Sequence, residues 1–283
     1  MFIKLAHIIN PVVVGETSDL FTAQPITFQT LMEARRYALP RVPVELCTAQ
    51  FAEDRELAPP EFLRTPNLER SILDFGTFEQ RRKLPLIQDI LGRLYEATDA
   101  DYLIYTNVDI GLQPYFYVAV ASLIKQGYDA FTVNRRVISD RFKRPEELPA
   151  IWAEVGKPHR GHDCFVFHRS LYPNFRFGHV CIGTGYIGKT LICNFLCHGK
   201  NSTLFADKHL TFHIGEDHRW RGGRSRDMLE FNKRECELAI GQLESEFGRF
   251  ERDYIGEHRL KKQGAGRPLE RLASAYRSLW NKK

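Results

Sequence analysis

Two oxygen-bearing side chains directly follow an apolar stretch in the segment Asp101-Tyr-Leu-Ile-Tyr-Thr-Asn107-Val-Asp109. Residues i and i+2 of an extended chain point to the same side, so Asn107 and Asp109 can face one point beyond the strand end. Two hard oxygen ligands of this kind suit Mg²⁺ or Mn²⁺ carrying a substrate diphosphate. The structural alternative is that both residues only form an Asx-type turn where the strand ends.

A second polar cluster, His213-Ile-Gly-Glu-Asp-His218, also follows an apolar segment. His213 is a candidate third ligand of the same divalent ion, with its other ring nitrogen held by a neighbouring acceptor. Histidines at strand ends are also common as structural residues with satisfied hydrogen bonds, and both interpretations stay open.

The triplet Gly161-His162-Asp163 precedes the apolar segment Cys164–His168. A carboxylate at the start of a buried strand is partly desolvated, which raises its basicity. Asp163 is therefore a candidate general base for an acceptor hydroxyl. The alternative is that Asp163 caps the loop and contacts no ligand.

Two short basic runs could supply donors to a nucleotide phosphate or base, namely Arg81-Arg82-Lys83 and Asn134-Arg135-Arg136. We take Lys83 and Arg135 as the candidates, against the alternative that both runs are solvated surface. The segment from Gly183 to Gly188 fits G-x-G-x-x-G superficially, but it lies far from the first strand. It predicts a turn that opens a helix and not a dinucleotide-binding fingerprint.

Strands and helices must position these side chains, and the hydrophobic pattern predicts that they alternate along the chain. Strands are expected over 4–14, 42–49, 102–108, 130–138, 164–168 and 204–213, and helices over 27–38, 86–95, 117–125, 184–197 and 227–250. This alternation predicts an α/β fold with a mainly parallel central sheet and helices on both faces. Ligands bind beyond the carboxyl ends of such strands. We expect a catalytic domain over 1–225 and a C-terminal helical segment over 226–283.

The order of these pieces resembles that of GT-A-type glycosyltransferases, which have a Rossmann-like nucleotide-sugar fold. The resemblance rests on Lys83 before the buried strand, on Asn107-Val-Asp109 after it, on the Gly161-His-Asp163 strand opening, and on Asp207-Lys-His-Leu-Thr-Phe-His213. It covers most of residues 1 to about 220. It implies an enzyme that transfers a sugar from a UDP- or GDP-type donor to a glycan, lipid-linked or small-molecule acceptor.

In that family a D-x-D-like motif and a downstream histidine bind the metal and the diphosphate, which implies Mn²⁺ or Mg²⁺ at Asn107, Asp109 and His213. The base of inverting members corresponds to Asp163. The first strand and its loop hold the nucleotide, which implies His7, Asn10 and Pro11. Asn107 replaces the leading carboxylate of D-x-D and removes one negative charge. Metal-independent or retaining transfer therefore stays an alternative.

Composition and charge narrow the class of protein. Of 283 residues 43% are hydrophobic and 27% are charged, which excludes a disordered chain, and no apolar stretch is long enough to span a membrane. The six cysteines form no CxxC pair, which favours buried free thiols in a reducing compartment and predicts a cytoplasmic protein.

The net charge of +5 is divided unevenly. Residues 259–283 carry eight Lys and Arg and one Glu, a charge of +7, and the remainder carries −2. The pattern of 269–280 predicts a basic amphipathic helix, which would bind an anionic inner-membrane surface or pack on its own domain or on a second subunit. Only Tyr276 and Trp280 are aromatic there, so nucleic acid is not the predicted partner.

Two other functions remain open. One is a different metal-dependent nucleotidyl- or phosphoryl-transfer enzyme that uses the same Asp109 site and releases pyrophosphate or phosphate. The other is a polyanion-binding module that acts through the basic tail.

Overall fold

The computed structural model describes residues 3–206, 208–216, 225–252 and 258–260. Its central sheet contains the following strands, in their spatial order: β3 (Leu63–Arg64), β2 (Val44–Thr48), β1 (Leu5–Ile9), β4 (Tyr102–Thr106), β7 (Lys157–His168), β6 (Ala130–Ile138), β9 (Thr211–Ile214) and β5 (Ile110–Leu112). β8 (Ser202–Phe205) pairs with the first part of β6, and β9 pairs with its last part.

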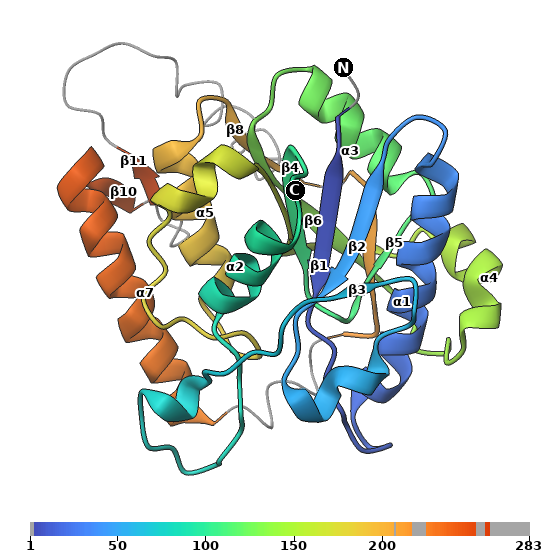
Figure 1. Ribbon diagram of the computed structural model, residues 1–283, viewed down its shortest axis with the longest axis horizontal. Helices are drawn as coiled ribbons and strands as arrows, with labels where there is room; N and C mark the ends of the chain where they lie inside the picture. The colour runs from blue at the N-terminus through green and yellow to red at the C-terminus, as the bar shows by residue number, and fades with distance from the viewer. Residues whose placement is uncertain (1–2, 207, 217–224, 253–257, 261–283) are drawn as a thin grey trace.

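Helices cover both faces of this sheet (Figure 1). One face carries α1 (Asp19–Ala38), α3 (Phe116–Lys125) and the short α4 (Leu148–Ala153). The other carries α2 (Ile87–Ala97), α5 (Ile187–His198) and α7 (Arg226–Phe247). The short 3₁₀ segments are η1 (Ala52–Leu57), η2 (Ile72–Asp74), η3 (Pro145–Glu147) and η4 (Arg169–Asn174).

The first strand shows why the sheet is buried on both sides. Ala6 and Ile8 point into the hydrophobic core under α2, α5 and α7, whereas Leu5 and Ile9 point into the core under α1 and α3. Successive strand residues alternate between faces, so a strand covered on both sides must be apolar throughout. The predicted α/β class with helices on both faces is confirmed.

The sheet is mainly parallel, as predicted, but it is mixed: five of its strand pairings are parallel and three are antiparallel. β1 runs parallel to β2 and β4, but β7 is antiparallel to both β4 and β6, and β5 is antiparallel to β9. The segment between β6 and β7 holds only η3 and α4 and returns to where it started, with Val137 paired to Lys157. A connection that returns to the same end of the sheet reverses the chain, and the next strand pairs antiparallel.

Three predicted elements have other bounds than expected. α1 begins after its N-cap Ser18, well before Thr27, because the helix accommodates Pro25 in its interior. The single strand expected over 204–213 is divided into β8 and β9. β7 begins at Lys157 rather than at Cys164, and this longer strand carries the polar triplet 161–163 inside the sheet.

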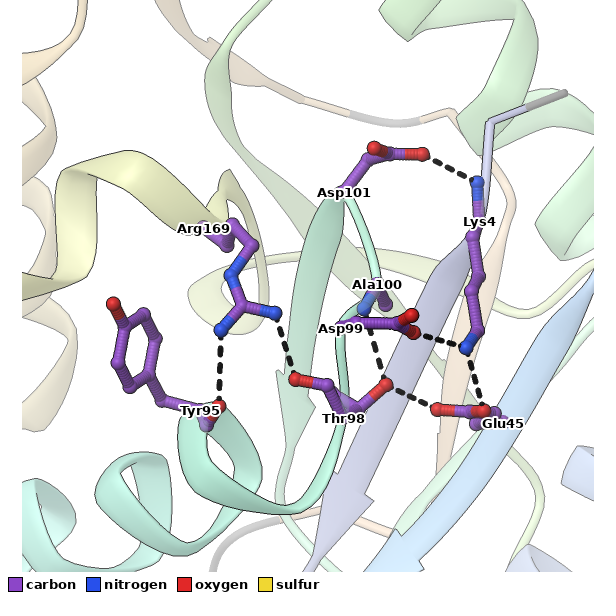
Figure 2. A network of polar contacts seen from close by, with 8 residues as sticks. All are labelled: Lys4, Glu45, Tyr95, Thr98, Asp99, Ala100, Asp101 and Arg169. Carbon is purple, nitrogen blue, oxygen red and sulfur yellow. Dashed lines mark hydrogen bonds and ion pairs between the residues drawn. The ribbon is translucent and has the colours of Figure 1, made fainter. Parts of the chain in front are cut away.

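The amino ends of β1 and β4 are joined by a polar network that Figure 2 shows. The Lys4 ammonium group lies between the carboxylates of Glu45 and Asp99, and the Lys4 backbone N–H donates to Asp101 at 2.9 Å. Beside it, the guanidinium group of Arg169 donates to the carbonyl oxygens of Thr98 (2.7 Å) and Tyr95 (3.2 Å), which lie at the end of α2. Arg169 directly follows β7, so its contacts fasten the end of α2 to the end of β7.

The C-terminal part of the chain is described only in pieces. α7 packs against α5 and contributes Cys236 and Ile240 to the core, and β10 (Phe250–Arg252) pairs with β11 (His258–Leu260). The predicted basic amphipathic helix over 269–280 lies outside the described residues, and the division of the chain at residue 225 stays a prediction. All six cysteines are free thiols, and all but Cys197 are buried. None of the described helices combines the length and the apolar character that crossing a membrane requires.

Candidate active site

A cavity of about 580 Å³ opens where β1 and β4 end. Because β1 and β4 run parallel and β7 runs antiparallel to β4, Asn10, Asn107 and Asp163 all lie at this one edge of the sheet. Residues that line the cavity include Asn10, Lys83, Asn107, Asp109, Arg135, His162, Asp163 and Thr184. The structure thus brings together six of the nine predicted site residues.

The loop after β1 forms one wall of the cavity, and two buried side chains hold its backbone. Gln24 of α1 accepts a hydrogen bond from the Val12 N–H and donates one to the Val12 carbonyl, both at 2.9 Å. Asp54 accepts from the Val13 N–H at 2.7 Å. Asn10 lines the cavity and donates to the Ala49 carbonyl. The wall is therefore fixed in shape before any ligand arrives.

Asn107 and Asp109 both line the cavity, but not as successive positions of an extended strand: β4 ends at Thr106, and residues 107–110 form a turn in which the Ile110 N–H donates to the Asn107 carbonyl at 3.2 Å. The Tyr105 hydroxyl donates to Asn107 Oδ1 at 2.7 Å, which orients the amide and leaves its second lone pair free to bind a cation. Asp109 Oδ2 lies 3.3 Å from Nε2 of His213. Asp109 Oδ1 is buried, and nothing in the described part of the chain donates a hydrogen bond to it.

The pair formed by His213 and Asp109 needs a positive charge between its members. His213 Nδ1 lies 2.8 Å from the Gly215 carbonyl oxygen, which can only accept, so Nδ1 carries a proton. Nε2 of a neutral ring would then present its lone pair to a carboxylate. Burial opposes both charged forms, but mutual attraction outweighs it, so that the pKa of His213 is raised and the pKa of Asp109 is lowered. Either a proton or a metal ion satisfies this geometry.

The residues present fit a divalent ion. Two cis ligands of an octahedral Mg²⁺ ion lie about 3 Å apart, close to the separation of Asp109 Oδ2 and His213 Nε2. The contact of Nδ1 with a carbonyl is the arrangement that orients metal-bound histidines. Within the described ranges no three His, Cys, Asp or Glu side chains converge, so the Asn107 amide, water and substrate phosphate would complete the coordination.

A β-bulge brings Asp163 into the cavity. In the β6–β7 register Val133 pairs with Cys164 and the next residue, Asn134, pairs with His162, so Asp163 is the extra residue. A second irregularity lies at Arg135, between Asn134 and Arg136. Bulges re-aim side chains beside active sites. Here they turn Asp163 and Arg135 toward each other, and Nη1 of Arg135 donates to Oδ2 of Asp163 at 2.8 Å.

The charge of Asp163 is balanced but its basicity is still increased. Burial raises the pKa of Asp163, the charge of Arg135 lowers it, and the charge of Asp109 raises it again, with a net increase. A carboxylate with a raised pKa accepts a proton more readily, as a general base must. Gly161 makes room for it, because a Cβ atom there would lie 2.8 Å from the His159 ring and 3.3 Å from Asp163 Oδ2.

The opposite wall is the glycine-rich segment that precedes α5. It lines the cavity from Ile182 to Gly188, and α5 begins at Ile187, so the segment does open a helix as predicted. Tyr186 adopts a left-handed conformation with φ of 79°. The hydroxyl oxygen of Thr184 is buried and has no hydrogen-bond partner among the described residues.

Lys83 lines the cavity but its ammonium group also has protein partners. It forms an ion pair with Glu53 at 2.7 Å and lies 4.0 Å from the centre of the Phe51 ring. Both partners belong to the segment after β2, so Lys83 joins this segment to the loop before α2. A phosphate that binds Lys83 would therefore compete with Glu53 for the same charge.

Three predicted site residues do not line the cavity. His7 is fully buried, and its two ring nitrogens lie 2.9 Å from the hydroxyls of Tyr117 and Thr106. Burial lowers the pKa of His7 to about 3, so it is a neutral core residue and cannot contact the nucleotide. Pro11 is buried between Asn10 and Val12, which do line the cavity. His213 lies behind Asp109 and would reach a ligand only through an ion bound between them.

Sequence reasoning missed several residues of the site. Gln24 and Asp54 hold the loop after β1, Tyr105 orients Asn107, and His162 lines the cavity next to Asp163. Tyr105 could have been found, because it shares the i, i+2 face of Asn107. His162 belongs to the polar triplet that the sequence analysis singled out, but it was given no role there. Nothing in the sequence indicates Gln24 or Asp54, since their roles depend on segments distant along the chain.

Comparison with known proteins gives only distant similarities. No protein-family model matches the chain, and no curated protein does. Among solved structures, TarS 1–349 from S. aureus in complex with UDP-GlcNAc has a TM-score of 0.47 and 8% identity, covering 84% of this chain and 66% of TarS 1–349. The chain thus spans just under two thirds of that protein.

A second similar structure is glucosyl-3-phosphoglycerate synthase from Mycobacterium tuberculosis in complex with Mn²⁺, UDP and phosphoglyceric acid. It has a TM-score of 0.47 and 15% identity, covering 82% of this chain and 78% of the synthase. The expected likeness to nucleotide-sugar glycosyltransferases is thus found among solved structures. At this distance it assigns no function, which has to be inferred from the geometry of the site.

Proposed function

We propose that the protein is a glycosyltransferase that moves a sugar from a nucleoside-diphosphate sugar to an acceptor hydroxyl. The observation that carries this proposal is the pair of carboxylates in one cavity, Asp109 and Asp163, with different partners and opposite pKa shifts. Two titratable groups whose environments shift their pKa values in opposite directions take different chemical roles. Asp109 stays ionised and suits a cation, whereas Asp163 suits proton transfer.

The donor would occupy the side of the cavity between Asn10 and Asp109. Asn107, Asp109 and His213 would hold a divalent ion. When bound, such an ion neutralises the charge that develops on the departing diphosphate. Lys83 and the loop after β1 line the cavity, so Lys83 would contact the diphosphate and the loop would contact the nucleoside.

The acceptor would lie between Asp163 and the segment before α5. Asp163 would take the proton of the acceptor hydroxyl as its oxygen attacks the anomeric carbon, through an oxocarbenium-like centre. Arg135 holds the carboxylate in place through an ion pair at 2.8 Å. An inverting reaction needs this base. A retaining reaction would not, and a test of the product's anomeric configuration distinguishes the two.

A thermal-shift screen tests the donor site. UDP, GDP, UDP-glucose, UDP-GlcNAc and GDP-mannose are added to the full chain, each with and without Mn²⁺. We expect one base type to raise the melting temperature in a metal-dependent way, by an amount that grows with ligand concentration. A flat response across the panel would contradict the proposal. Release of pyrophosphate in place of nucleoside diphosphate would favour the nucleotidyl-transfer alternative.

Peripheral attachment to an anionic membrane and homodimerisation are proposed for the segment 261–283, outside the described residues. Sedimentation with vesicles of phosphatidylcholine and phosphatidylglycerol, before and after truncation at Gly256, tests the first proposal. Sedimentation equilibrium of the same two forms tests the second.

A further inference from the structure

His162 lines the cavity immediately before Asp163, which ordinary strand geometry would not allow. Neighbouring strand residues point to opposite faces of a sheet. The register between β6 and β7 pairs Val133 with Cys164 and Asn134 with His162, so the extra residue Asp163 breaks the alternation. Both side chains therefore line the same cavity.

The hydroxyl of Thr132 decides which ring nitrogen of His162 carries the proton. Thr132 is fully buried on β6, and its Oγ1 lies 2.9 Å from His162 Nδ1. Within the described ranges, Nδ1 is the only acceptor that this hydroxyl has. Buried hydroxyl donors are nearly always satisfied, so Thr132 donates to Nδ1. The ring proton of neutral His162 is then on Nε2.

The surroundings of His162 keep the ring uncharged and fixed in place. Burial, aided by the charge of His159, lowers the pKa of His162 to about 4. At neutral pH the ring is therefore uncharged and offers a single hydrogen-bond donor, Nε2–H. The first turn of α5 packs against it, because a Cβ atom on Gly188 would lie 3.5 Å from the His162 carbonyl and 4.0 Å from its Cβ atom.

Nε2 of His162 has no protein partner among the residues that the structure describes. No residue in the described part of the chain forms a hydrogen bond with it, and the side chain is partly exposed where it lines the cavity. A fixed N–H group that faces a substrate cavity is a recognition element, because leaving it unpaired after water is displaced costs free energy.

We propose that His162 is an acceptor-binding residue whose Nε2–H donates a hydrogen bond to an oxygen of the acceptor alcohol, beside Asp163. This inference rests on the proposed glycosyltransferase function. His162 itself transfers no proton. It holds the acceptor oxygen so that the hydroxyl proton points to the Asp163 carboxylate, and Thr132 acts as the positioning residue that fixes the tautomer.

The tautomer is tested without any substrate, by ¹⁵N NMR of histidine-labelled protein, with His162→Asn to assign the signals. We expect a neutral ring protonated on Nε2 from pH 8 down to pH 5.5. Thr132→Val should mix the two tautomers. A ring protonated on Nδ1, or a charged ring at pH 7, would overturn the proposal. Failure of the donor screen would leave this measurement intact, so the two proposals fail separately.

The role in binding is tested by two substitutions, one that replaces only the Nδ1 side of the ring and one that replaces only the Nε2 side. Asparagine at 162 reaches Thr132 but lacks the cavity-side donor, whereas glutamine places an amide N–H where Nε2 was. The assay is UDP or GDP release from UDP-glucose, UDP-GlcNAc or GDP-mannose with water as the acceptor. The loss of one ordinary hydrogen bond should slow nucleoside diphosphate release roughly tenfold in His162→Asn. In His162→Gln, which keeps a donor, the rate should fall about threefold or less.

Both variants should bind UDP or GDP like the parent chain and keep its melting temperature, because His162 lies on the acceptor side. Equal loss in both variants together with a lowered melting temperature would mean a structural role and contradict the proposal. Full activity of His162→Asn, or weakened nucleoside diphosphate binding in that variant, would contradict it as well.

Discussion

The two ends of β4 carry similar residues in different environments. At the amino end, the charges of Lys4, Glu45 and Asp99 pair with one another near the surface (Figure 2). At the carboxyl end, Asp109 and Asp163 lie in a cavity, largely buried, and one oxygen of Asp109 has no partner within the described ranges. Solvent screens the charges of the first set. Burial of the second set costs free energy and shifts the pKa values of its carboxyl groups. The same strand is thus fastened at one end and left open for chemistry at the other.

The largest effect is expected from breaking the buried ion pair. Arg135→Met leaves Asp163 charged in a largely buried site, and we expect a loss of about 3–5 kcal/mol in the free energy of unfolding. Urea unfolding monitored by circular dichroism measures it. The double variant Arg135→Met/Asp163→Asn should recover more than half of the loss. Additive losses in the double variant would mean that the two groups do not interact.

The next effect is on activity. Asp109→Asn removes the carboxylate that faces His213, and we expect sugar transfer to fall on the order of 10²–10³-fold, the typical cost of removing an electrostatic group from an active site. Release of nucleoside diphosphate is the assay. Asp101→Asn is the matched control, because Asp101 precedes the same strand and contacts Lys4. Equal activity of the two variants would mean that the carboxylate at the carboxyl end of β4 is no more important for activity than the one at its amino end.

The third prediction concerns pH. The folded-state pKa values of His7 (about 3) and His162 (about 4) lie below the ordinary 6.5, so the unfolded chain binds more protons in between. Their stabilising contribution is complete above about pH 6.5 and is lost as the pH falls toward these values. Each residue should lower the free energy of unfolding by about 1.5 kcal/mol between pH 6.5 and 5. Urea unfolding at both pH values measures it, and His7→Gln should flatten the slope. An unchanged slope in that variant would show that His7 is protonated in the folded protein.

A smaller effect is expected at the amino edge, where Arg169 holds the end of α2. Arg169→Met removes two charge-assisted hydrogen bonds to the Thr98 and Tyr95 carbonyls, and the free energy of unfolding should fall by about 1.5 kcal/mol. Turnover per folded molecule should not change. A decrease in turnover at constant stability would link this edge to the cavity.

The smallest effect is expected at Lys4. Its ion pairs are partly exposed, and Lys4→Met should cost less than about 1 kcal/mol, a difference that largely disappears in 1 M NaCl. Chemical denaturation at low and high salt measures it, with Arg135→Met as the contrasting case that salt should change little. A large effect that salt does not weaken would place Lys4 among the buried pairs.

Local pattern was a sufficient guide for some parts of the site. The Asn107-x-Asp109 spacing predicted two neighbouring ligands after a strand; both residues line the cavity, from a turn rather than from an extended strand, and their role as ligands stays a prediction. The glycine-rich segment before α5 was also interpreted correctly. Both predictions depend on geometry within a few residues, which the sequence specifies directly. His7 shows the limit, because its type suited a nucleotide site but Tyr117 and Thr106 enclose it from distant strands and helices.

By itself, the sequence determined that this is an α/β chain whose polar clusters follow buried strands, because the period of hydrophobic residues is a property of the local chain. It also determined the uneven distribution of charge. Only the tertiary structure decided that the sheet is mixed, that Asp163 faces Arg135, and that His162 shares their cavity. These features come from the register between β6 and β7. Register is set by packing across the sheet, and one extra residue in a strand redirects every side chain beside it.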